Sequence, residues 1–543
     1  MRSWTLGIAR RRFAMCHGKR LLALVPLLLL VFLAACGSST PVTPPPPSGN
    51  FSNASLNGQY AFSMSGENAT NGAFVGCIGS IAADGNGHIT SGLEDVLDLS
   101  TGSPASTVTF SDGTYQIEQN GRGTMTLNVT GGGSLTLSLS LQSNAQGFLI
   151  QTDGADSASG TLNLQTPLQF SGASLNGKYV FSFSGISFAG QSPSIISTIG
   201  QFAADGNGNV AGGTVDVNDG SFQPSGAITL APSTYQFDTN GNGTNFGRGM
   251  MTLNGKTYAF YIVNNARVKF LEEDTTGGSA GDAFLQTGAI PVQNSDLKGN
   301  FVFQSGGRVT TGNFGPLARL GRMTTDGNAG VNAVVFDENE DGNNTHLSAN
   351  SSISNAGYSI DTANAGSGRG TFTFTNGDVG TVSYIFYFYS PTRAVIQDVS
   401  PRIVSAGTLL AQIAGPFTTS SVTGNFIFIW SGLQLINPSP FEENFVGQGA
   451  QTTATSSNFT GAADFTELGL TSSTSAVTLN AGISATLTIS GDGTQDNTFK
   501  VAVGGPSPFT VNFKAYIADN SDIFLICYDS NRTTAGVQIV QPQ

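Results

Sequence analysis

The chain has 543 residues with few charges, 22 Lys and Arg against 35 Asp and Glu, and a formal net charge of −13. Phosphate backbones and anionic lipid headgroups repel such a protein, which excludes nucleic acid as a partner and leaves membrane contact to some other device. Glycine is abundant at 71 residues, and 37 Phe stand against two Trp, a composition typical of short strands, many turns and small aromatic cores.

The first 36 residues carry the most specific signal. A basic head without acids, from Arg2 to Arg20, precedes an apolar run over residues 21–35 that only Pro26 interrupts. This is the pattern of an export signal, and the run is shorter than the roughly 20 residues that a membrane-spanning helix needs. It ends in Leu33-Ala34-Ala35-Cys36, which resembles the lipobox of bacterial lipoproteins.

That resemblance implies cleavage just before Cys36 and diacylation of its thiol; an uncleaved anchor is the alternative. Two or three acyl chains give a stable anchor, at about 0.8 kcal/mol per buried methylene. Gly37 replaces the Asp that usually marks inner-membrane retention, so the resemblance implies a cell-envelope protein of the outer rather than the inner membrane. The run Arg10-Arg11-Arg12-Phe13 also resembles a twin-arginine signal, although any basic head explains it. The mature chain keeps 16 basic and 35 acidic residues, a net charge of −19.

A proline-rich segment, residues 41–50, follows the anchor and predicts an extended polyproline II spacer. Cys16 leaves with the signal, so Cys77 and Cys527 remain besides the lipidated cysteine. We expect both to be buried single thiols, because a disulfide between them would require the two ends of the folded part to touch.

From Phe51 onward the chain repeats itself with a period of about 120 residues. Each copy opens with Gly followed by two aromatic residues two positions apart, and closes with Gly followed by Gln five positions later. The opening glycines are Gly58, Gly177, Gly299 and Gly424, and the closing glutamines are Gln165, Gln286, Gln412 and Gln541. The predicted organisation is a signal peptide (1–35), a lipidated tether (36–50) and four β-modules (51–167, 168–288, 289–412 and 413–543).

Apolar and polar residues alternate within the copies, as over residues 124–129 and 134–141, which is typical of antiparallel strands with one buried face. Runs such as Asp84-Gly85-Asn86-Gly87 predict tight hairpin turns, and no segment has a helical period. The fold class is therefore all-β, with four tandem antiparallel modules of about eight strands each.

A closed barrel is the favoured form of each module, because closure removes the exposed edges of a flat sheet. The Gly-x-Tyr opening and the strand count resemble the up-and-down barrels of the lipocalin and avidin group. A β-sandwich of immunoglobulin-like length is the alternative, although its Cys, Trp, Cys pattern is absent. Each copy is long enough for its own core, so we expect independent domains strung along the chain.

One segment resembles a metal site. Asp337, Asn339 and Asp341, followed by Gly342, match the first half of an EF-hand calcium loop. The twelfth position is Ser348 where a bidentate Glu is needed, and no helices flank the segment. We therefore expect an acidic solvated loop, and neither a metal nor a cofactor.

Three arginines recur next to turn glycines, Arg122, Arg248 and Arg369. Their guanidinium groups could bind an anionic ligand, or they could pair with the aspartates that close the penultimate strands; we favour the pairing. Those aspartates are Asp153, Asp274, Asp398 and Asp529. The fourth copy lacks the arginine, so a shared site would be lost or altered there.

Catalytic residues are few. Only His88 and His346 remain in the mature chain, neither in a recurring position, and Trp430 lies in the core pattern. We therefore predict a non-catalytic, membrane-anchored extracytoplasmic lipoprotein with a structural, adhesive or display role, whose partner is an envelope or extracellular protein. The alternative is small-ligand or carbohydrate binding in barrel interiors or inter-module clefts. Least favoured is a hydrolase that uses two carboxylates.

Overall fold

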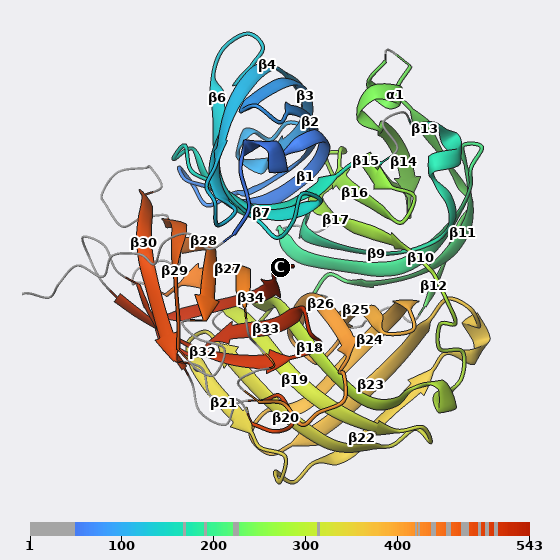
Figure 1. The fold of residues 1–543 in the computed structure, drawn as a ribbon. Helices are drawn as coiled ribbons and strands as arrows, with labels where there is room; N and C mark the ends of the chain where they lie inside the picture. The colour runs from blue at the N-terminus through green and yellow to red at the C-terminus, as the bar shows by residue number, and fades with distance from the viewer. Residues whose placement is uncertain are drawn as a thin grey trace, which may run out of the picture. The chain divides into compact units, whose positions relative to one another are not determined.

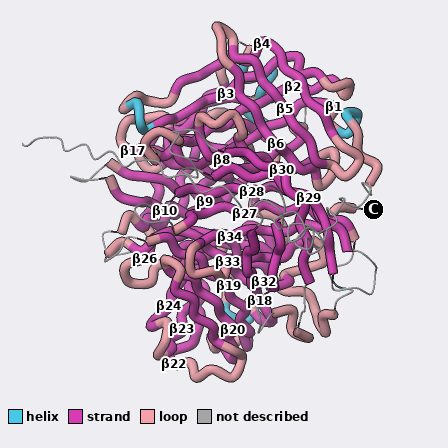
Figure 2. The backbone as a smooth tube through the Cα atoms, turned by 90° about the vertical axis from the view of Figure 1, so that its left-hand side faces the viewer, coloured by secondary structure: helices cyan, strands magenta, loops and turns pink. Residues whose placement is uncertain are grey.

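The computed structural model describes residues 49–166, 170–188, 193–220, 227–239, 241–311, 315–418, 421, 424–435, 441–451, 458–467, 477–486, 490–494, 499–503 and 509–542. Cys36 and the tether before Gly49 lie outside these ranges. Strands dominate the described residues (Figure 2), and none of the helices there is long and apolar enough to cross a membrane.

Module 1 is a closed barrel of eight antiparallel strands, in which each strand pairs with the next and β8 returns to β1. Its strands are β1 (Asn57–Asn68), β2 (Phe74–Asp84), β3 (His88–Asp98), β4 (Ser106–Ile117), β5 (Arg122–Val129), β6 (Ser134–Leu141), β7 (Gln146–Gln151) and β8 (Asp156–Leu164).

Module 4 is the second closed barrel. Its strands are β27 (Asn425–Gln434), β28 (Phe441–Gln451), β29 (Asn458–Glu467), β30 (Val477–Thr486), β31 (Phe499–Val503), β32 (Phe509–Ile517), β33 (Asp522–Cys527) and β34 (Arg532–Val540).

Module 2 is one nine-stranded sheet. Eight of its strands are linked all the way round, because β10 pairs with β11 as well as β9, while β12 pairs only along β11. The strands are β9 (Asn176–Ser187), β10 (Ser194–Asp205), β11 (Asn209–Asn218), β12 (Ile228–Leu230), β13 (Ser233–Phe237), β14 (Arg248–Leu253), β15 (Lys256–Asn264), β16 (Arg267–Glu272) and β17 (Gly277–Leu285).

Module 3 is a nine-stranded sheet whose edges are β21 and β22. An isolated bridge between Gly330 and Gly357 joins the two sides. The strands are β18 (Lys298–Val309), β19 (Pro316–Asp326), β20 (Val331–Glu340), β21 (Asn343–Leu347), β22 (Ser354–Ile360), β23 (Arg369–Asn376), β24 (Gly380–Ser390), β25 (Arg393–Asp398) and β26 (Ile403–Ala411).

The prediction of an all-β chain with four tandem modules is thus confirmed. The favoured closed barrel is found in modules 1 and 4, whereas modules 2 and 3 are nine-stranded sheets. Each module is a single continuous sheet, so the sandwich alternative is wrong. Helical turns are short connectors. They are α1 (Asn242–Phe246), η2 (Asn53–Ser55), η3 (Leu99–Thr101), η4 (Gly172–Ser174), η5 (Asn294–Asp296) and η6 (Thr362–Asn364).

Aromatic and aliphatic side chains fill the interior of each module. In every module a Phe of the first strand lies opposite a Gly of the second, and its ring occupies the space that a Cβ would need. These pairs are Phe62 with Gly79, Phe181 with Gly200, Phe303 with Gly321, and Phe428 with Gly447. Trp430 stacks on Phe428 in the module 4 core, at 4.8 Å between ring centroids, as the sequence pattern predicts.

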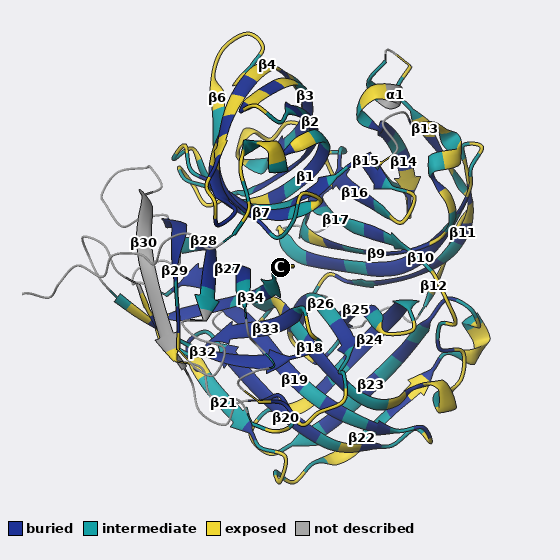
Figure 3. Ribbon diagram, in the orientation of Figure 1, coloured by how far each residue is buried: buried dark blue, intermediate teal, exposed yellow. Residues whose placement is uncertain are grey.

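A second set of apolar clusters lies between modules rather than inside them. Leu93 of module 1 packs with Tyr261 of module 2, Val180 of module 2 with Tyr387 of module 3, Leu320 of module 3 with Tyr516 of module 4, and Ile150 of module 1 with Ile427 of module 4. The contacts therefore form a closed circuit, in which module 4 returns to module 1 (Figures 1 and 3).

The expectation of independent domains along a string is therefore wrong, since Pro44–Gln543 forms one compact unit. The physical reason is that the outer faces of many strands are apolar as well as the inner ones: all six residues of β33 are buried. The two remaining cysteines, Cys77 and Cys527, are buried free thiols, as predicted.

Candidate functional site

Ion pairs join neighbouring modules at the recurring arginines. Nε and Nη2 of Arg248, in module 2, donate to the two carboxylate oxygens of Asp95, in module 1, at 2.8 Å each. Asp95 is completely buried, and Nη1 of Arg248 also binds Asp238 of its own module at 2.7 Å. Such a bidentate pair fixes geometry as well as charge.

An arginine–aspartate pair recurs at two further contacts between modules, which we call joints. Arg369 of module 3 binds Asp216 of module 2 through Nε and Nη2, at 2.8 Å each, and the Tyr387 hydroxyl donates to Asp216 at 2.6 Å. Arg122 of module 1 makes a single bond, from Nη2 to Asp464 of module 4 at 2.8 Å, 342 positions away.

The joint between modules 3 and 4 uses different cations. Asp337, which is fully buried, accepts from the Tyr516 hydroxyl at 2.5 Å and lies 3.4 Å from Nζ of Lys514. The Nδ1 atom of His346 lies 2.8 Å from the same carboxylate. The tyrosine contact therefore recurs, as at Tyr387, while Lys514 of module 4 and His346 of module 3 lie where the other joints have an arginine.

The closing glutamines form the other half of each joint. The side-chain amide of Gln165 donates to backbone carbonyls of Phe246 and Ile262, at 2.9 and 2.6 Å. The other three repeat this on the following module: Gln286 on Ser367 and Phe388, Gln412 on Asp492 and Ile517, and Gln541 on Asn120 and Leu141. The motif that marks the repeat boundary in the sequence is therefore a clamp onto the next module.

The strand-end aspartates do not pair with the arginines, contrary to the favoured expectation. They accept from backbone N–H groups of a neighbouring strand: Asp153 from Thr136, Asp274 from Thr257, and Asp529 from Asn512. In module 3 the hydroxyl of Ser400 does this, by accepting from the N–H of Ser383. Ser400, and not Asp398, therefore occupies in module 3 the position that Asp153 occupies in module 1.

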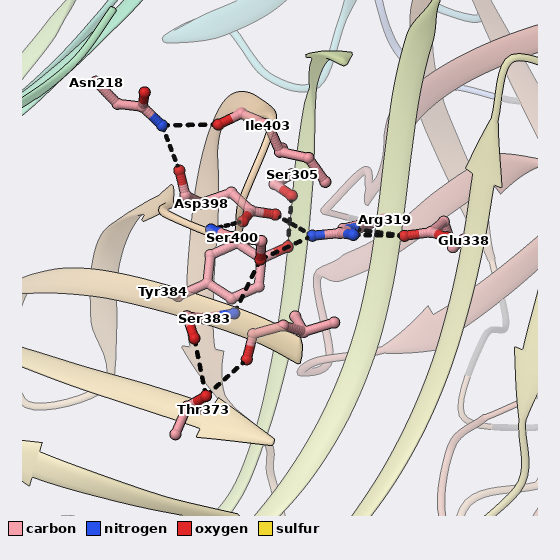
Figure 4. Close-up of polar contacts among 11 residues, drawn as sticks. Asn218, Ser305, Arg319, Glu338, Thr373, Ser383, Tyr384, Asp398, Ser400 and Ile403 are labelled. Carbon is pink, nitrogen blue, oxygen red and sulfur yellow. Dashed lines mark hydrogen bonds and ion pairs between the residues drawn. The ribbon is translucent and has the colours of Figure 1, made fainter. Parts of the chain in front are cut away.

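Asp398 belongs to a buried charged cluster inside module 3, shown in Figure 4. Arg319, whose side chain is 3% exposed, binds Asp398 and also donates from Nε to Glu338 at 2.7 Å. Burial raises the pKa of Glu338, although Arg319 opposes this. Asn218 of module 2 donates to the carbonyls of Asp398 and Ile403, at 2.8 Å each, which ties the cluster to the neighbouring module.

The segment that resembles a calcium loop is a strand and a tight turn, so the expected solvated loop is wrong. Asp337 and Asn339 belong to β20 and are fully buried. The amide of Asn339 donates to the carbonyls of Cys527 and Arg532 in module 4, at 2.9 and 2.7 Å. Asp341 and Gly342 have φ values of 52° and 81°, as a type I′ hairpin turn requires. In the described ranges no three His, Cys, Asp or Glu side chains are placed to hold a metal ion.

Two cavities lie where all four modules meet. The first has a volume of about 480 Å³ and receives Gln146, Arg267, Arg393 and Asp522, one from each module. The second has a volume of about 580 Å³ and is lined by a glycine from the first strand of every module, Gly66, Gly185, Gly307 and Gly432.

Two carboxylates share the second cavity, Glu67 and Glu442. Burial raises the pKa of both, and each interacts with Arg308. Glu67 is held by Arg308 at 3.1 Å, and Glu442 accepts from the amide of Asn444 at 3.0 Å. The charge of Glu67 further raises the pKa of Glu442.

Sequence reasoning missed the acidic side of the joints. Asp95, Asp216, Asp337 and Asp464 occupy the same place in the third strand of each module, and this recurrence is visible in the sequence. The pairing could not be predicted because the partners are distant in the sequence: Asp95 and Asp216 each meet an arginine 153 positions away.

Comparisons with known proteins add little to this geometry. No family model matches the chain, and no curated protein matches it. Among solved structures, transferrin binding protein B from Haemophilus parasuis Hp5 is 11% identical, covering 72% of this chain and 81% of that one, with a TM-score of 0.19. The isotype 1 transferrin binding protein B from serogroup B Neisseria meningitidis is 11% identical, covering 74% and 84%, with a TM-score of 0.19. A putative AttH from Nitrosomonas europaea is 8% identical, covering 65% and 91%, with a TM-score of 0.16. TM-scores this low do not establish a shared fold.

Proposed function

We propose that the chain is a lipid-anchored extracytoplasmic protein with a non-catalytic structural, adhesive or display role. The observation that carries this proposal is the use of the recurring residues: the arginines, aspartates and glutamines that repeat from module to module are bonded to neighbouring modules. Features that repeat four times in this chain therefore build one body rather than four ligand sites. Its partner in this role is an envelope or extracellular protein.

The anchor is proposed to be Cys36, lipidated after removal of residues 1–35 and followed by a tether over residues 36–50. The four modules then take residues 51–167, 168–288, 289–412 and 413–543. An acidic body of net charge −19 gains nothing from anionic headgroups, so acyl chains would supply the membrane attachment. The outer membrane is the proposed destination.

The alternative of ligand binding inside the barrels loses support from the cores. In module 4, for example, Trp430 is in ring contact with Phe445 and Phe513, at 4.6 and 4.8 Å between centroids. Among the side chains that the structure describes, a guest in this core would have to displace aromatic rings.

Substitution of the lipidation cysteine tests the proposal. The Cys36→Ser variant should lose the acyl mass and leave the membrane fraction, whereas Cys16→Ser, in the same leader, should remain acylated and membrane-bound. Density-gradient separation of inner and outer membranes then gives the destination. Membrane retention of Cys36→Ser, or a wild-type chain without acyl mass, would contradict the proposed anchor.

A further inference from the structure

The first central cavity is built from equivalent positions of the four modules. The first residues of β7, β16, β25 and β33 are Gln146, Arg267, Arg393 and Asp522, and all of them line it. Each pairs across the sheet with a residue that also lines it, respectively Asn163, Phe284, Leu410 and Ile539. Two residues from each module therefore surround the same space.

These positions differ between modules, in contrast to the clamp glutamines. The clamp position is Gln in all four copies, whereas the cavity positions are an amide pair in module 1, arginine with an apolar partner in modules 2 and 3, and aspartate with an apolar partner in module 4. The cavity has instead a different chemical group on each side.

Asn163 is the clearest sign of a missing partner. Its side chain lines the cavity and the residue is 6% exposed, yet its Oδ1 atom has no hydrogen-bond partner among the described residues. A buried carbonyl oxygen that has lost its hydrogen bond to water and forms no other is destabilising, and native proteins rarely leave such an atom unpaired. The Oδ1 atom is enclosed by protein in this rotamer, and a rotation of the amide would turn it toward the cavity, where a ligand donor would remove that cost.

Arg267 of module 2 and Arg393 of module 3 supply hydrogen-bond donors to the cavity. Nη2 of Arg393 binds Asp522 and Asp519 of module 4, at 2.5 and 3.1 Å, and Nε of Arg267 binds Asp282 at 3.0 Å. A guanidinium has five N–H donors, so each arginine keeps donors for a ligand. The side chains are 38% and 23% exposed, which leaves the cavity open to solvent.

The acidic partners decide the charge of the ligand. Each guanidinium is neutralised by at least one carboxylate, and the folded chain as a whole is acidic, so an anion has no net attraction to this cavity. A hydroxyl group, by contrast, both donates and accepts, and can serve Asn163 and an arginine at once. Phe148, Leu410 and Phe524 add apolar surface to the walls.

We infer that this cavity binds a neutral polyhydroxylated molecule of monosaccharide to disaccharide size. Its volume of about 480 Å³ lies within the roughly 300–1,000 Å³ of small-molecule sites. The inference deepens the non-catalytic role proposed above and rests on it: a tethered body would hold a sugar between its modules without transforming it.

Saturation-transfer NMR on the full-length lipidated protein tests the inference, in a sugar-free detergent such as lauryldimethylamine oxide. The probes are glucose, galactose, mannose, N-acetylglucosamine, maltose, cellobiose and lactose, with glucuronate and N-acetylneuraminate as anionic counterparts. At least one neutral probe should give a saturable signal. Asn163→Leu should weaken its binding about tenfold, because the buried acceptor is lost.

Two further variants keep the test decisive. Gln146→Leu, in the neighbouring strand, should also weaken binding and replaces Asn163→Leu if that variant does not fold. Arg308→Met, in the second central cavity, is the matched control and should leave binding unchanged. Absence of any saturable neutral probe, preference for the anionic sugars, or an equal loss in Arg308→Met would overturn the inference. Failure of the lipid anchor would appear separately, in the fractionation of Cys36→Ser.

Discussion

The side-chain amide of Gln541 donates a 2.7 Å hydrogen bond to the backbone carbonyl of Leu141, 400 residues earlier in the chain. A second bond of 3.1 Å reaches the carbonyl of Asn120. Because Gln165, Gln286 and Gln412 make the same contacts with the module that follows each of them, the last module clamps the first just as each earlier module clamps the next.

Replacing Gln541 should destabilise the joint between module 4 and module 1. Gln541→Leu leaves two buried carbonyls without donors, so we expect about 2 kcal/mol less stability in urea denaturation. Gln116→Leu, at an exposed position of β4, is the control and should lie within about 0.5 kcal/mol of the wild type. Equal effects of the two substitutions would show that the clamp contributes nothing.

Breaking the ion pair between modules 1 and 2 should lower the free energy of unfolding more than the loss of the Gln541 clamp does. Arg248→Met leaves Asp95 as a fully buried charge, and we expect a loss of about 3 kcal/mol, again from urea denaturation. The double variant Asp95→Asn with Arg248→Met should recover part of that loss, because the stranded charge is gone. A double variant no more stable than Arg248→Met would mean that the buried charge is not the cause.

The phenylalanine opposite each strand-two glycine predicts a steric effect. A Cβ on Gly321 would lie 2.1 Å from the Phe303 ring, so Gly321→Ala should lose about 2 kcal/mol in thermal or chemical denaturation. At Gly377 a Cβ meets no atom within 4 Å, and the φ angle is not in the left-handed region. Gly377→Ala should therefore be close to neutral; a comparable loss there would point to backbone effects rather than to the ring.

Stability should fall as the pH rises through the neutral range, and Glu94 should be one cause. Burial raises the pKa of Glu94 to about 8, with Cys77 and Asp95 close by. Below its unfolded pKa near 4.5 the carboxyl is protonated in both states, and its contribution to stability is fully present. Between pH 4.5 and 8 the unfolded state ionises first, so that contribution is lost.

Glu94→Gln should remove this loss. We expect the free energy of unfolding, measured by urea denaturation, to fall between pH 5 and pH 8 by roughly 2–4 kcal/mol less in the variant than in the wild type. Asp156, Glu273 and Glu467, with pKa values raised to about 6, 7 and 7, act in the same direction but are present in both proteins and cancel in the comparison. Parallel pH profiles would contradict this assignment.

The sequence predicts strands well because alternation is a local signal. In module 1 the alternation over residues 134–141 coincides with the observed strand Ser134–Leu141, and the turn Asp84-Gly85-Asn86-Gly87 lies between β2 and β3 as expected. Alternation does not show which outer strand faces are covered, because an apolar residue has the same appearance in the sequence whether it packs inside a barrel or between two modules. For this reason the prediction of independent modules is wrong.

Site prediction from the sequence failed for a related reason. Arg122, Arg248 and Arg369 recur as identified, but their partners are set by contacts between modules, which no spacing within one copy reveals. Residue type alone aligns Asp398 with Asp153, but the structural counterpart of Asp153 is Ser400. The Ser400 hydroxyl accepts from a backbone N–H, as the Asp153 carboxylate does.

Hydrogen-exchange mass spectrometry of Arg248→Met shows whether the joints couple the modules into one body. The substitution lies in β14 of module 2, and its lost partner lies in β3 of module 1. Coupled modules should show faster amide exchange in both strands. Faster exchange confined to module 2, with β3 as protected as in the wild type, would contradict this coupling.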